Sequence, residues 1–224
     1  MKRTFTILSA LLTAANVFAA VGDTFTVDNV NYKITSEISL EVAGGDNKKS
    51  SSLPAKLNIP STVVYNDNTY TVTSISNEAF RRCTTLNTVT IPNTVKSIGN
   101  YGFYECWSVN QLTLGSAIES IGEFAFYNCS ALTSVTIPNS VKSIGINAFC
   151  KCYNLTSFEG DFASDDKRCL IIDGTLLAFA PTNITEYTIP NSVTKIGEDA
   201  FSGLNVTSIT IGNSVKSIES YAFY

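Results

Sequence analysis

Residues 91–106 read IPNTVKSIGNYGFYEC, residues 114–129 read LGSAIESIGEFAFYNC and residues 137–152 read IPNSVKSIGINAFCKC. Each segment begins 23 residues after the one before it, and the same residue types recur at the same places. A repeat of this length is typical of a solenoid, in which each unit packs only on its neighbours. The sequence therefore predicts one elongated stack of repeats, an architecture that usually serves as a binding surface.

The order of residues within one repeat predicts how each turn of the stack is built. Val135 and Ile137 are apolar and alternate with polar residues, which indicates a short half-buried strand. Pro138 removes a backbone donor and ends this strand. We expect Gly145 to adopt a positive φ at the next corner and Phe149 to fill the core from a short helical turn. The predicted fold class is a mainly β repeat solenoid of parallel strands with short helical turns.

The period is interrupted between Ile137 and Ile189, which lie 52 residues apart. The extra segment contains two apolar runs on either side of Asp173-Gly174, and this dipeptide favours a two-residue hairpin turn. We therefore interpret residues 160–188 as one widened repeat that bears an added hairpin. The last two repeats begin 22 residues apart, because the turn at 201–204 is shorter and lacks the cysteine of the earlier repeats.

Residues 20–58 do not repeat. Thr24–Val27 and Tyr32–Ile34 flank Asp28-Asn29, which predicts a hairpin that covers the open edge of the first repeat. A second hairpin turn is expected within 65–70, and the loop 44–50 is expected to be mobile. The predicted organisation is a signal peptide at 1–19, an N-terminal β cap at 20–58 and a solenoid at 59–224.

The first residues have the pattern of an export signal. Lys2 and Arg3 precede the apolar run Phe5–Leu12, and small residues at 17 and 19 fit cleavage after Ala19. The apolar run is too short to span a bilayer, and no longer one follows. We therefore expect the protein to be secreted or displayed at the cell surface.

Charge and composition exclude several functions. The formal charge is −4, and removing residues 1–19 makes it more negative by two, which argues against nucleic acid as a partner. The chain has no histidine, so no histidine-based triad or zinc site can be built. We expect no catalytic residues, no metal and no cofactor.

Four cysteines, one in each of four successive repeats, predict a column along the stack. Identical side chains stacked in parallel point the same way, so we interpret these as buried free thiols and not as disulfides or a zinc site. Cys150 and Cys169 lie outside the column, and a disulfide between them is an alternative to two free thiols in an exported chain. The column consists of Cys83, Cys106, Cys129 and Cys152.

Two surfaces are candidates for ligand binding. The first is the outer face of the strands, where the polar residues either suit an exposed strand or form a ligand-binding face. The second is a stripe of aromatic residues before and after the core phenylalanine, which either cover the core or contact a protein or glycan. The strand-face candidates are Thr90, Gln111, Thr113, Ser134 and Thr136, and the aromatic candidates are Tyr101, Tyr104, Trp107, Phe124 and Tyr127.

The widened repeat is rich in acidic residues. Asp161, Asp165, Asp166 and Asp173 have no calcium-loop spacing, so a solvated loop is the first interpretation. Paired carboxylates can act on glycosides, which leaves a glycan-active enzyme as an alternative, but nothing in the sequence places these carboxylates across a cleft.

The consensus of the repeats, IPxxVxxIGxxAFxxCxxLTxVT, resembles the BspA-like leucine-rich repeats, the bacterial 23-residue class found in surface proteins of host-associated anaerobes and some protozoa. The resemblance covers residues 59–224 and implies a role in adhesion, with host matrix proteins among the ligands, and no shared catalytic residues. The consensus is matched by Ile137-Pro138, Val141, Ile144-Gly145, Ala148-Phe149, Cys152 and Leu155-Thr156.

The function expected from residues and resemblance together is non-catalytic binding of an extracellular protein or glycan. The alternative is a structural spacer, a fragment of a longer surface protein that holds another domain away from the cell.

Overall fold

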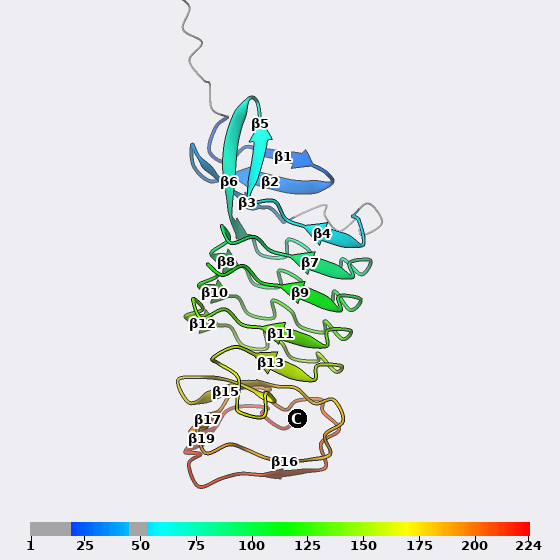
Figure 1. Cartoon of the computed structure of the whole chain (residues 1–224), viewed down its shortest axis with the longest axis vertical. Helices are drawn as coiled ribbons and strands as arrows, with labels where there is room; N and C mark the ends of the chain where they lie inside the picture. The colour runs from blue at the N-terminus through cyan, green and yellow to red at the C-terminus, as the bar shows by residue number, and fades with distance from the viewer. Residues whose placement is uncertain (1–18, 45–52) are drawn as a thin grey trace, which may run out of the picture.

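The computed structural model describes residues 19–44 and 53–224, and within them the chain consists of β-strands and turns without a helix. The strands are stacked along one long axis, with the cap strands at one end and the last repeats at the other (Figure 1). The predicted solenoid is therefore confirmed. The predicted signal peptide lies outside the described residues except for Ala19. The loop 44–50 likewise lies outside them except for Gly44.

Parallel strands run along two sides of the stack. On one side, two-residue strands pair in register, as in Ser120 with Ser143, and extend the sheet of the cap. On the other side, three-residue strands form three short sheets of order β4-β7-β9, β11-β13 and β16-β18. The first row contains β8 (Ser97–Ile98), β10 (Ser120–Ile121) and β12 (Ser143–Ile144). The second contains β4 (Lys56–Asn58), β7 (Thr88–Thr90), β9 (Gln111–Thr113), β11 (Ser134–Thr136), β13 (Ser157–Glu159), β16 (Glu186–Thr188) and β18 (Ser208–Thr210).

The predicted short helical turns are wrong, because this part of each repeat is a run of β-turns. Asn147 and Lys151 both have a φ of 59°, and pairs of positive φ four residues apart recur in the other repeats. A left-handed residue interrupts an α-helix, so hydrogen bonds reach back only three residues, as from Ala148 N–H to the Gly145 carbonyl at 3.3 Å. The phenylalanine still fills the core as predicted, and Phe126 and Phe149 stack with ring centroids 5.3 Å apart.

Gly145 does not adopt the predicted positive φ. It is required for a different reason, because a Cβ atom at this position would lie 2.4 Å from the backbone nitrogen of Glu123 in the preceding repeat. Gly122 has the same relation to Asn100, at 2.5 Å. Glycine therefore lets the backbones of consecutive repeats approach closely at this corner.

The cap contains two hairpins. Asp28 and Asn29 turn the first and Asn66 and Asp67 the second, all with positive φ, as two-residue hairpin loops require. Both hairpins occur where the sequence predicted them, but their strands join one sheet, and β4, inside residues 20–58, pairs with β7 of the solenoid. The cap strands are β1 (Thr24–Val27), β2 (Val30–Ile34), β3 (Ser39–Val42), β5 (Thr62–Tyr65) and β6 (Asn68–Ile75).

The hairpin predicted around Asp173-Gly174 is present and consists of β14 (Cys169–Ile172) and β15 (Thr175–Phe179). It lies inside the stack, where β15 pairs with β17 (Lys195–Ile196), which in turn pairs with β19 (Ser217–Ile218). Side chains of β14 alternate between the two sides, and a bulge at Leu177 shifts this alternation within β15. Leu170, Ala178 and Ala180 therefore join the large N-terminal core, while Cys169, Leu176 and Phe179 join a smaller C-terminal core.

The two cores meet at a seam between residues 147–151 and 199–203. In the regular repeats, backbone hydrogen bonds join successive turns, as from Phe126 N–H to the Ala148 carbonyl at 2.8 Å. Among the described residues no such bond extends from Phe149 to the following repeat. The side chain of Asn147 spans the seam instead, and its Nδ2 donates to Asp199 Oδ2 at 2.8 Å.

Candidate functional site

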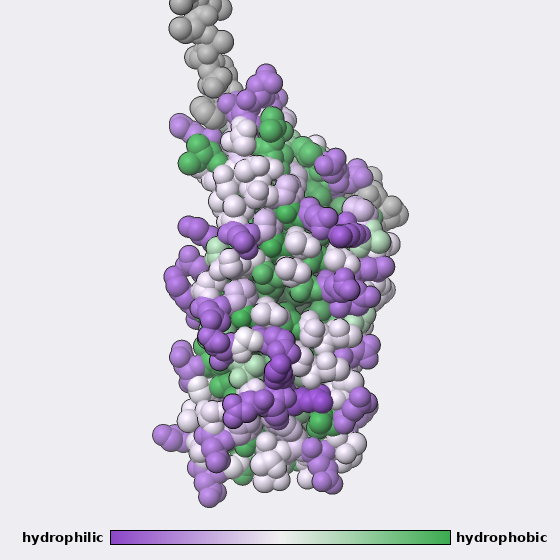
Figure 2. Space-filling view, in the orientation of Figure 1, coloured by the Kyte–Doolittle hydropathy of each residue, from purple (hydrophilic) through white to green (hydrophobic). Residues whose placement is uncertain are grey.

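The strand face is oriented as predicted. In each three-residue strand the middle side chain points into the core and the outer two point outward. The outward side chains are uncharged on β7, β9 and β11, so they present hydroxyl and amide groups at the spacing of parallel strands. In the same orientation as Figure 1, Figure 2 shows hydrophilic residues along both sides of the stack. Thr90 is half-buried, and Gln111, Thr113, Ser134 and Thr136 are exposed.

Four of the five predicted aromatic residues form a compact array, which we call the aromatic patch. Tyr101 stacks on Phe124 with centroids 5.1 Å apart, and Tyr104 stacks on Tyr127 at the same distance. The two stacks meet edge to face between Tyr101 and Tyr104 at 5.4 Å. All four residues are half-buried. Trp107 is 49% exposed and lies outside this array.

A positive charge lies over each end of the aromatic patch. The guanidinium carbon of Arg81 lies 5.2 Å from the centroid of Tyr104, and Lys151 Nζ lies 5.2 Å from the centroid of Tyr127. Both distances are within cation–π range, which is worth about 0.5–1 kcal/mol at exposed sites. A hydrogen bond with the Tyr127 side chain raises the pKa of Lys151. The patch therefore combines aromatic faces with Lys151 and with an arginine whose guanidinium also pairs with Glu78 at 3.0 Å.

Two rings of the patch are placed by an unfavourable backbone conformation. Tyr101 has a φ of 59° and Phe124 a φ of 54°, and bulky residues rarely adopt the left-handed region. Such a conformation costs on the order of 1–2 kcal/mol. The stacking with neighbouring rings contributes a similar amount, about 0.5–1.5 kcal/mol for each pair. Packing within the patch therefore offsets the backbone cost of placing the rings there.

The cysteine column is buried and reduced, as predicted. Cys83, Cys106, Cys129 and Cys152 are free thiols in the core, and burial raises the pKa of Cys83 to about 11 and that of Cys152 to about 12. Thiols with such pKa values are unreactive near neutral pH. Their role is to pack.

The Cys150–Cys169 disulfide is not formed, and both thiols are free. Cys169 points into the C-terminal core, where its Sγ lies 3.3 Å from the hydroxyl of Tyr187. Cys150 is half-buried at the seam, where burial raises its pKa to about 11. The hairpin turns Cys169 away from Cys150 because β14 alternates its side chains between the two cores.

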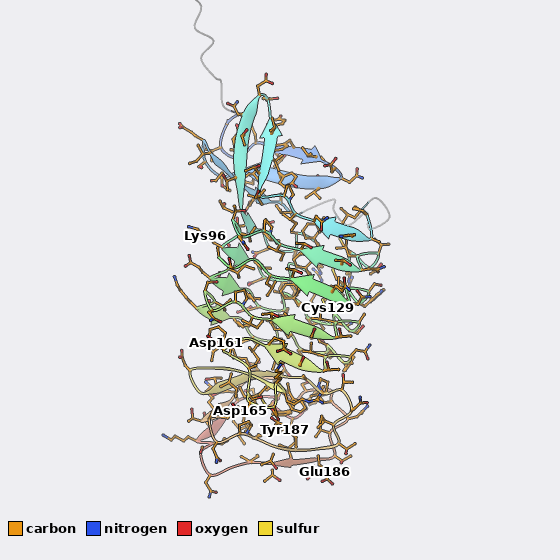
Figure 3. The ribbon with its side chains drawn as sticks, viewed as in Figure 1. Lys96, Cys129, Asp161, Asp165, Glu186 and Tyr187 are labelled. Carbon is orange, nitrogen blue, oxygen red and sulfur yellow. The ribbon has the colours of Figure 1, made fainter. Side chains whose placement is uncertain are left out.

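The four acidic residues of the widened repeat are all exposed, but they differ in their hydrogen bonds. Asp161 and Asp165 lie in the same part of the stack as Tyr187 (Figure 3). Asp166 accepts hydrogen bonds from Ser164 Oγ at 2.5 Å and from the Tyr187 hydroxyl at 2.8 Å. Burial opposes ionisation of Asp166, but these hydrogen bonds outweigh it and lower its pKa. The carboxylate of Asp166 therefore serves to fix the loop against β16.

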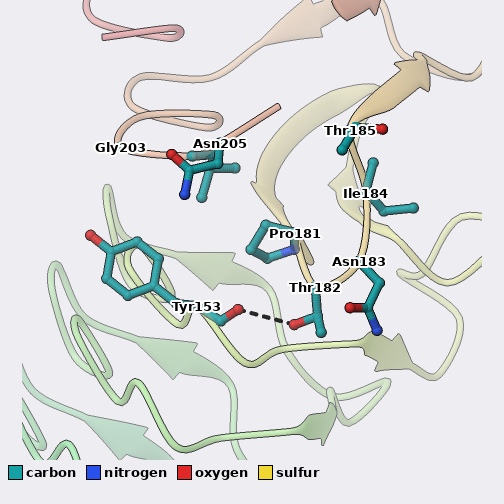
Figure 4. Close-up of a pocket in the computed structure, with 9 residues that line it drawn as sticks. Tyr153, Pro181, Thr182, Asn183, Ile184, Thr185, Gly203 and Asn205 are labelled. Carbon is teal, nitrogen blue, oxygen red and sulfur yellow. Dashed lines mark hydrogen bonds between the residues drawn. The ribbon is translucent and has the colours of Figure 1, made fainter. Parts of the chain in front are cut away.

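A hollow of about 820 Å³ opens beside the seam, and the sequence did not predict its lining residues. Figure 4 shows Tyr153 and Asn205 on one side, Asn183, Ile184 and Thr185 on the other, and Pro181 between them. Thr182 Oγ1 donates to the backbone carbonyl of Tyr153 at 3.0 Å and ties the two walls together. We call this hollow the groove; it is lined by Tyr153, Pro181, Thr182, Asn183, Ile184, Thr185, Gly203, Leu204 and Asn205.

The groove forms where repeats with turns of different length are stacked. Leu155 lies six positions after Phe149, but Val206 lies only five positions after Phe201. Tyr153 therefore projects beyond the shorter turn that follows, and Gly203 adds no side chain beside its hydroxyl. The signal in the sequence is the shortened turn at 201–204, which by itself does not indicate a cavity.

No group of three or more potential metal ligands occurs among residues 19–44 and 53–224. The same residues contain no helix that is long and apolar enough to cross a membrane.

A family model described as a BspA type leucine-rich repeat region matches this chain in six copies, over residues 55–164 and 177–224. The gap between the two matched ranges contains β14 and the start of β15, so the family pattern is interrupted where the hairpin enters the stack. No curated protein matches the sequence.

Solved structures of bacterial repeat proteins resemble this chain. A leucine-rich repeat protein from Bacteroides capillosus is 30% identical, with a TM-score of 0.55, over 61% of this chain and 96% of that one. The pneumococcal vaccine antigen PcpA is 17% identical, with a TM-score of 0.57, over 92% of this chain and 68% of the antigen. A leucine-rich repeat protein from T. pallidum is 20% identical, with a TM-score of 0.52, over 88% of this chain and 86% of that one. The last two likenesses show the fold alone.

Proposed function

Because the chain belongs to the BspA-type leucine-rich repeat family, we propose that it is a secreted or cell-surface binding protein that contacts an extracellular protein through its aromatic patch. The proposal includes no catalytic step. A repeat stack supports such a role because it displays side chains from successive repeats on one continuous surface.

The observation that carries this proposal is the aromatic patch with its two cations. Aromatic residues and arginine are enriched at the centres of protein interfaces, where they contribute most of the binding energy. The rings of the patch are already held by stacking, so little side-chain entropy is lost when a partner binds. Lys151 favours a partner surface that carries a carboxylate beside apolar groups, whereas the charge of Arg81 is already paired with Glu78.

The test is surface plasmon resonance of the purified chain over immobilised extracellular matrix glycoproteins, each used before and after enzymatic removal of its glycans. We expect binding that survives deglycosylation and that Tyr127→Ala weakens by about 10- to 100-fold, the effect typical of an interface hot spot. Thr113→Arg, on the strand face, is the control and is expected to bind like the unmodified chain.

Two results would contradict the proposal. Binding that Thr113→Arg abolishes and Tyr127→Ala leaves intact would place the partner on the strand face. If the chain is folded, as a cooperative melting transition would show, and binds none of the proteins tested, the result would favour the structural spacer.

A further inference from the structure

The groove differs from the aromatic patch in the chemistry of its lining. None of its nine lining residues carries a charge, and they combine one exposed aromatic ring with amide, hydroxyl and aliphatic groups. Tyr153 is 43% exposed. Ligand sites commonly have a volume of about 300–1,000 Å³, with a few polar groups that fix orientation. The groove has the size and mixture of groups of such a site.

Two amides in the groove are free to bind a ligand. Asn183 and Asn205 are exposed, and within the part of the chain that the structure describes their side chains make no hydrogen bond. A side-chain amide has two hydrogen-bond donors and one acceptor oxygen, so it can pair with a ligand group that both donates and accepts hydrogen bonds. Asn183 and Asn205 lie on opposite walls, so one ligand can contact both (Figure 4).

We propose that the groove binds a neutral oligosaccharide, with a sugar ring stacked on Tyr153 and its hydroxyl groups paired with the amides of Asn183 and Asn205. Sugar rings have apolar C–H faces and a rim of hydroxyls that donate and accept, which the ring and the amides complement. No lining residue carries a charge to pair with a carboxylate or sulfate, and the neighbouring Lys151 places its Nζ over the ring of Tyr127, so the lining itself gives an acidic saccharide no compensation for desolvation.

The groove forms without an induced change, because the walls are already joined. Thr182 uses its hydroxyl to bond the Tyr153 carbonyl, and its N–H donates to the Leu155 carbonyl at 3.2 Å. The backbone at Tyr153 and the strip 181–185 are thereby held in a fixed relation, which lowers the entropy cost of binding. This inference uses residues outside the aromatic patch and does not depend on the proposed protein partner.

The test is isothermal titration calorimetry of the full chain with four neutral hexasaccharides, cellohexaose, xylohexaose, maltohexaose and β-1,4-mannohexaose, and with hexagalacturonic acid as the charged comparison. We expect at least one neutral hexasaccharide to bind with a Kd below about 1 mM. Tyr153→Ala is expected to weaken this binding by at least about tenfold, and Asn205→Ala by a few-fold. Tyr153→Phe keeps the ring and is expected to bind nearly as well as tyrosine.

Trp107→Ala is the matched control, because Trp107 is another exposed aromatic residue at the same repeat position, two repeats before Tyr153, and does not line the groove. Its removal is expected to leave saccharide binding unchanged. The proposal is overturned if none of the four neutral hexasaccharides binds at 5 mM, or if Tyr153→Ala binds like the unmodified chain. Tighter binding of hexagalacturonic acid than of every neutral probe would also overturn it.

Discussion

At the scale of the residue, single glycines decide how closely the repeats approach. Gly145 lies against the backbone of Glu123, and the same contact recurs one repeat earlier between Gly122 and Asn100. Backbone atoms cannot rotate away as a side chain can, so any Cβ at these corners has to push two repeats apart. Glycine recurs at this position from repeat to repeat because of this contact and not because the position requires a positive φ.

We predict that Gly145→Ala destabilises the chain by about 1–3 kcal/mol, the usual cost of overpacking a close-packed interior. Urea denaturation followed by circular dichroism measures the change. Gly212→Ala is the control, because a Cβ at 212 meets first the end of the Asn191 side chain at 3.3 Å, which can move. Equal losses in the two variants would show that the backbone contact at 145 is not the cause.

At the scale of the element, the hydrogen bonds around Asp166 join the acidic loop, β14 and β16. Ser164 and Tyr187 both donate to the Asp166 carboxylate, and the Cys169 N–H donates to Ser164 Oγ at 2.9 Å. These bonds favour the ionised carboxylate and lower its pKa in the folded protein. In an unfolded chain Asp has a pKa of about 3.9.

Because its folded pKa is lower, Asp166 contributes stability above the unfolded value and loses it as the pH falls through the folded value. We predict that the unmodified chain is more stable than Asp166→Asn at pH 6 and that this difference shrinks steadily below about pH 4. Urea denaturation at pH 6, 5, 4 and 3 measures it. Asp165→Asn, at the exposed neighbouring residue, is the control and is expected to show a smaller difference at pH 6. A difference for Asp166→Asn that stays constant with pH would refute the role of the ionised carboxylate.

At the scale of the whole molecule, the seam divides the stack into two parts of unequal size. The N-terminal core extends from Val30 to Ala180, whereas the C-terminal core contains far fewer buried side chains. In the last repeat Ile218 is 49% exposed and Phe223 is 44% exposed. Repeat proteins are stabilised by each unit and its interfaces, so a weak interface lets one part unfold before the other.

We predict that the C-terminal part unfolds at a lower urea concentration than the N-terminal part. Trp107 is the single tryptophan and lies on the N-terminal side of the seam, so its fluorescence reports that side alone. Circular dichroism reports both parts, and its transition is expected to begin before that of fluorescence. Leu176→Ala removes a fully buried side chain of the C-terminal core and should lower only the first transition. Coincident transitions in both proteins would show that the stack unfolds as one unit.

Part of this architecture could be predicted because it depends on local patterns. Alternation identified the outward residues Thr113 and Thr136, and Asp173-Gly174 identified a hairpin turn. The helical turns were predicted wrongly because the sequence around Ala148 and Phe149 does not reveal that Asn147 and Lys151 are left-handed. The aromatic residues were selected correctly, but their arrangement into two stacks with a cation at each end was not foreseen.

The sequence by itself determined the repeat, the columns of buried apolar residues and therefore the stacking of strands into a solenoid. When identical units are stacked, the repeat length alone determines which side chains lie next to each other, so the packing of the regular repeats can be predicted from the sequence. Only the tertiary structure decided where unlike units meet: the hairpin with a core on each face, the seam and the groove at Tyr153. These features depend on the relative length of turns that are far apart in sequence, and the contact between such turns exists only after the chain has folded.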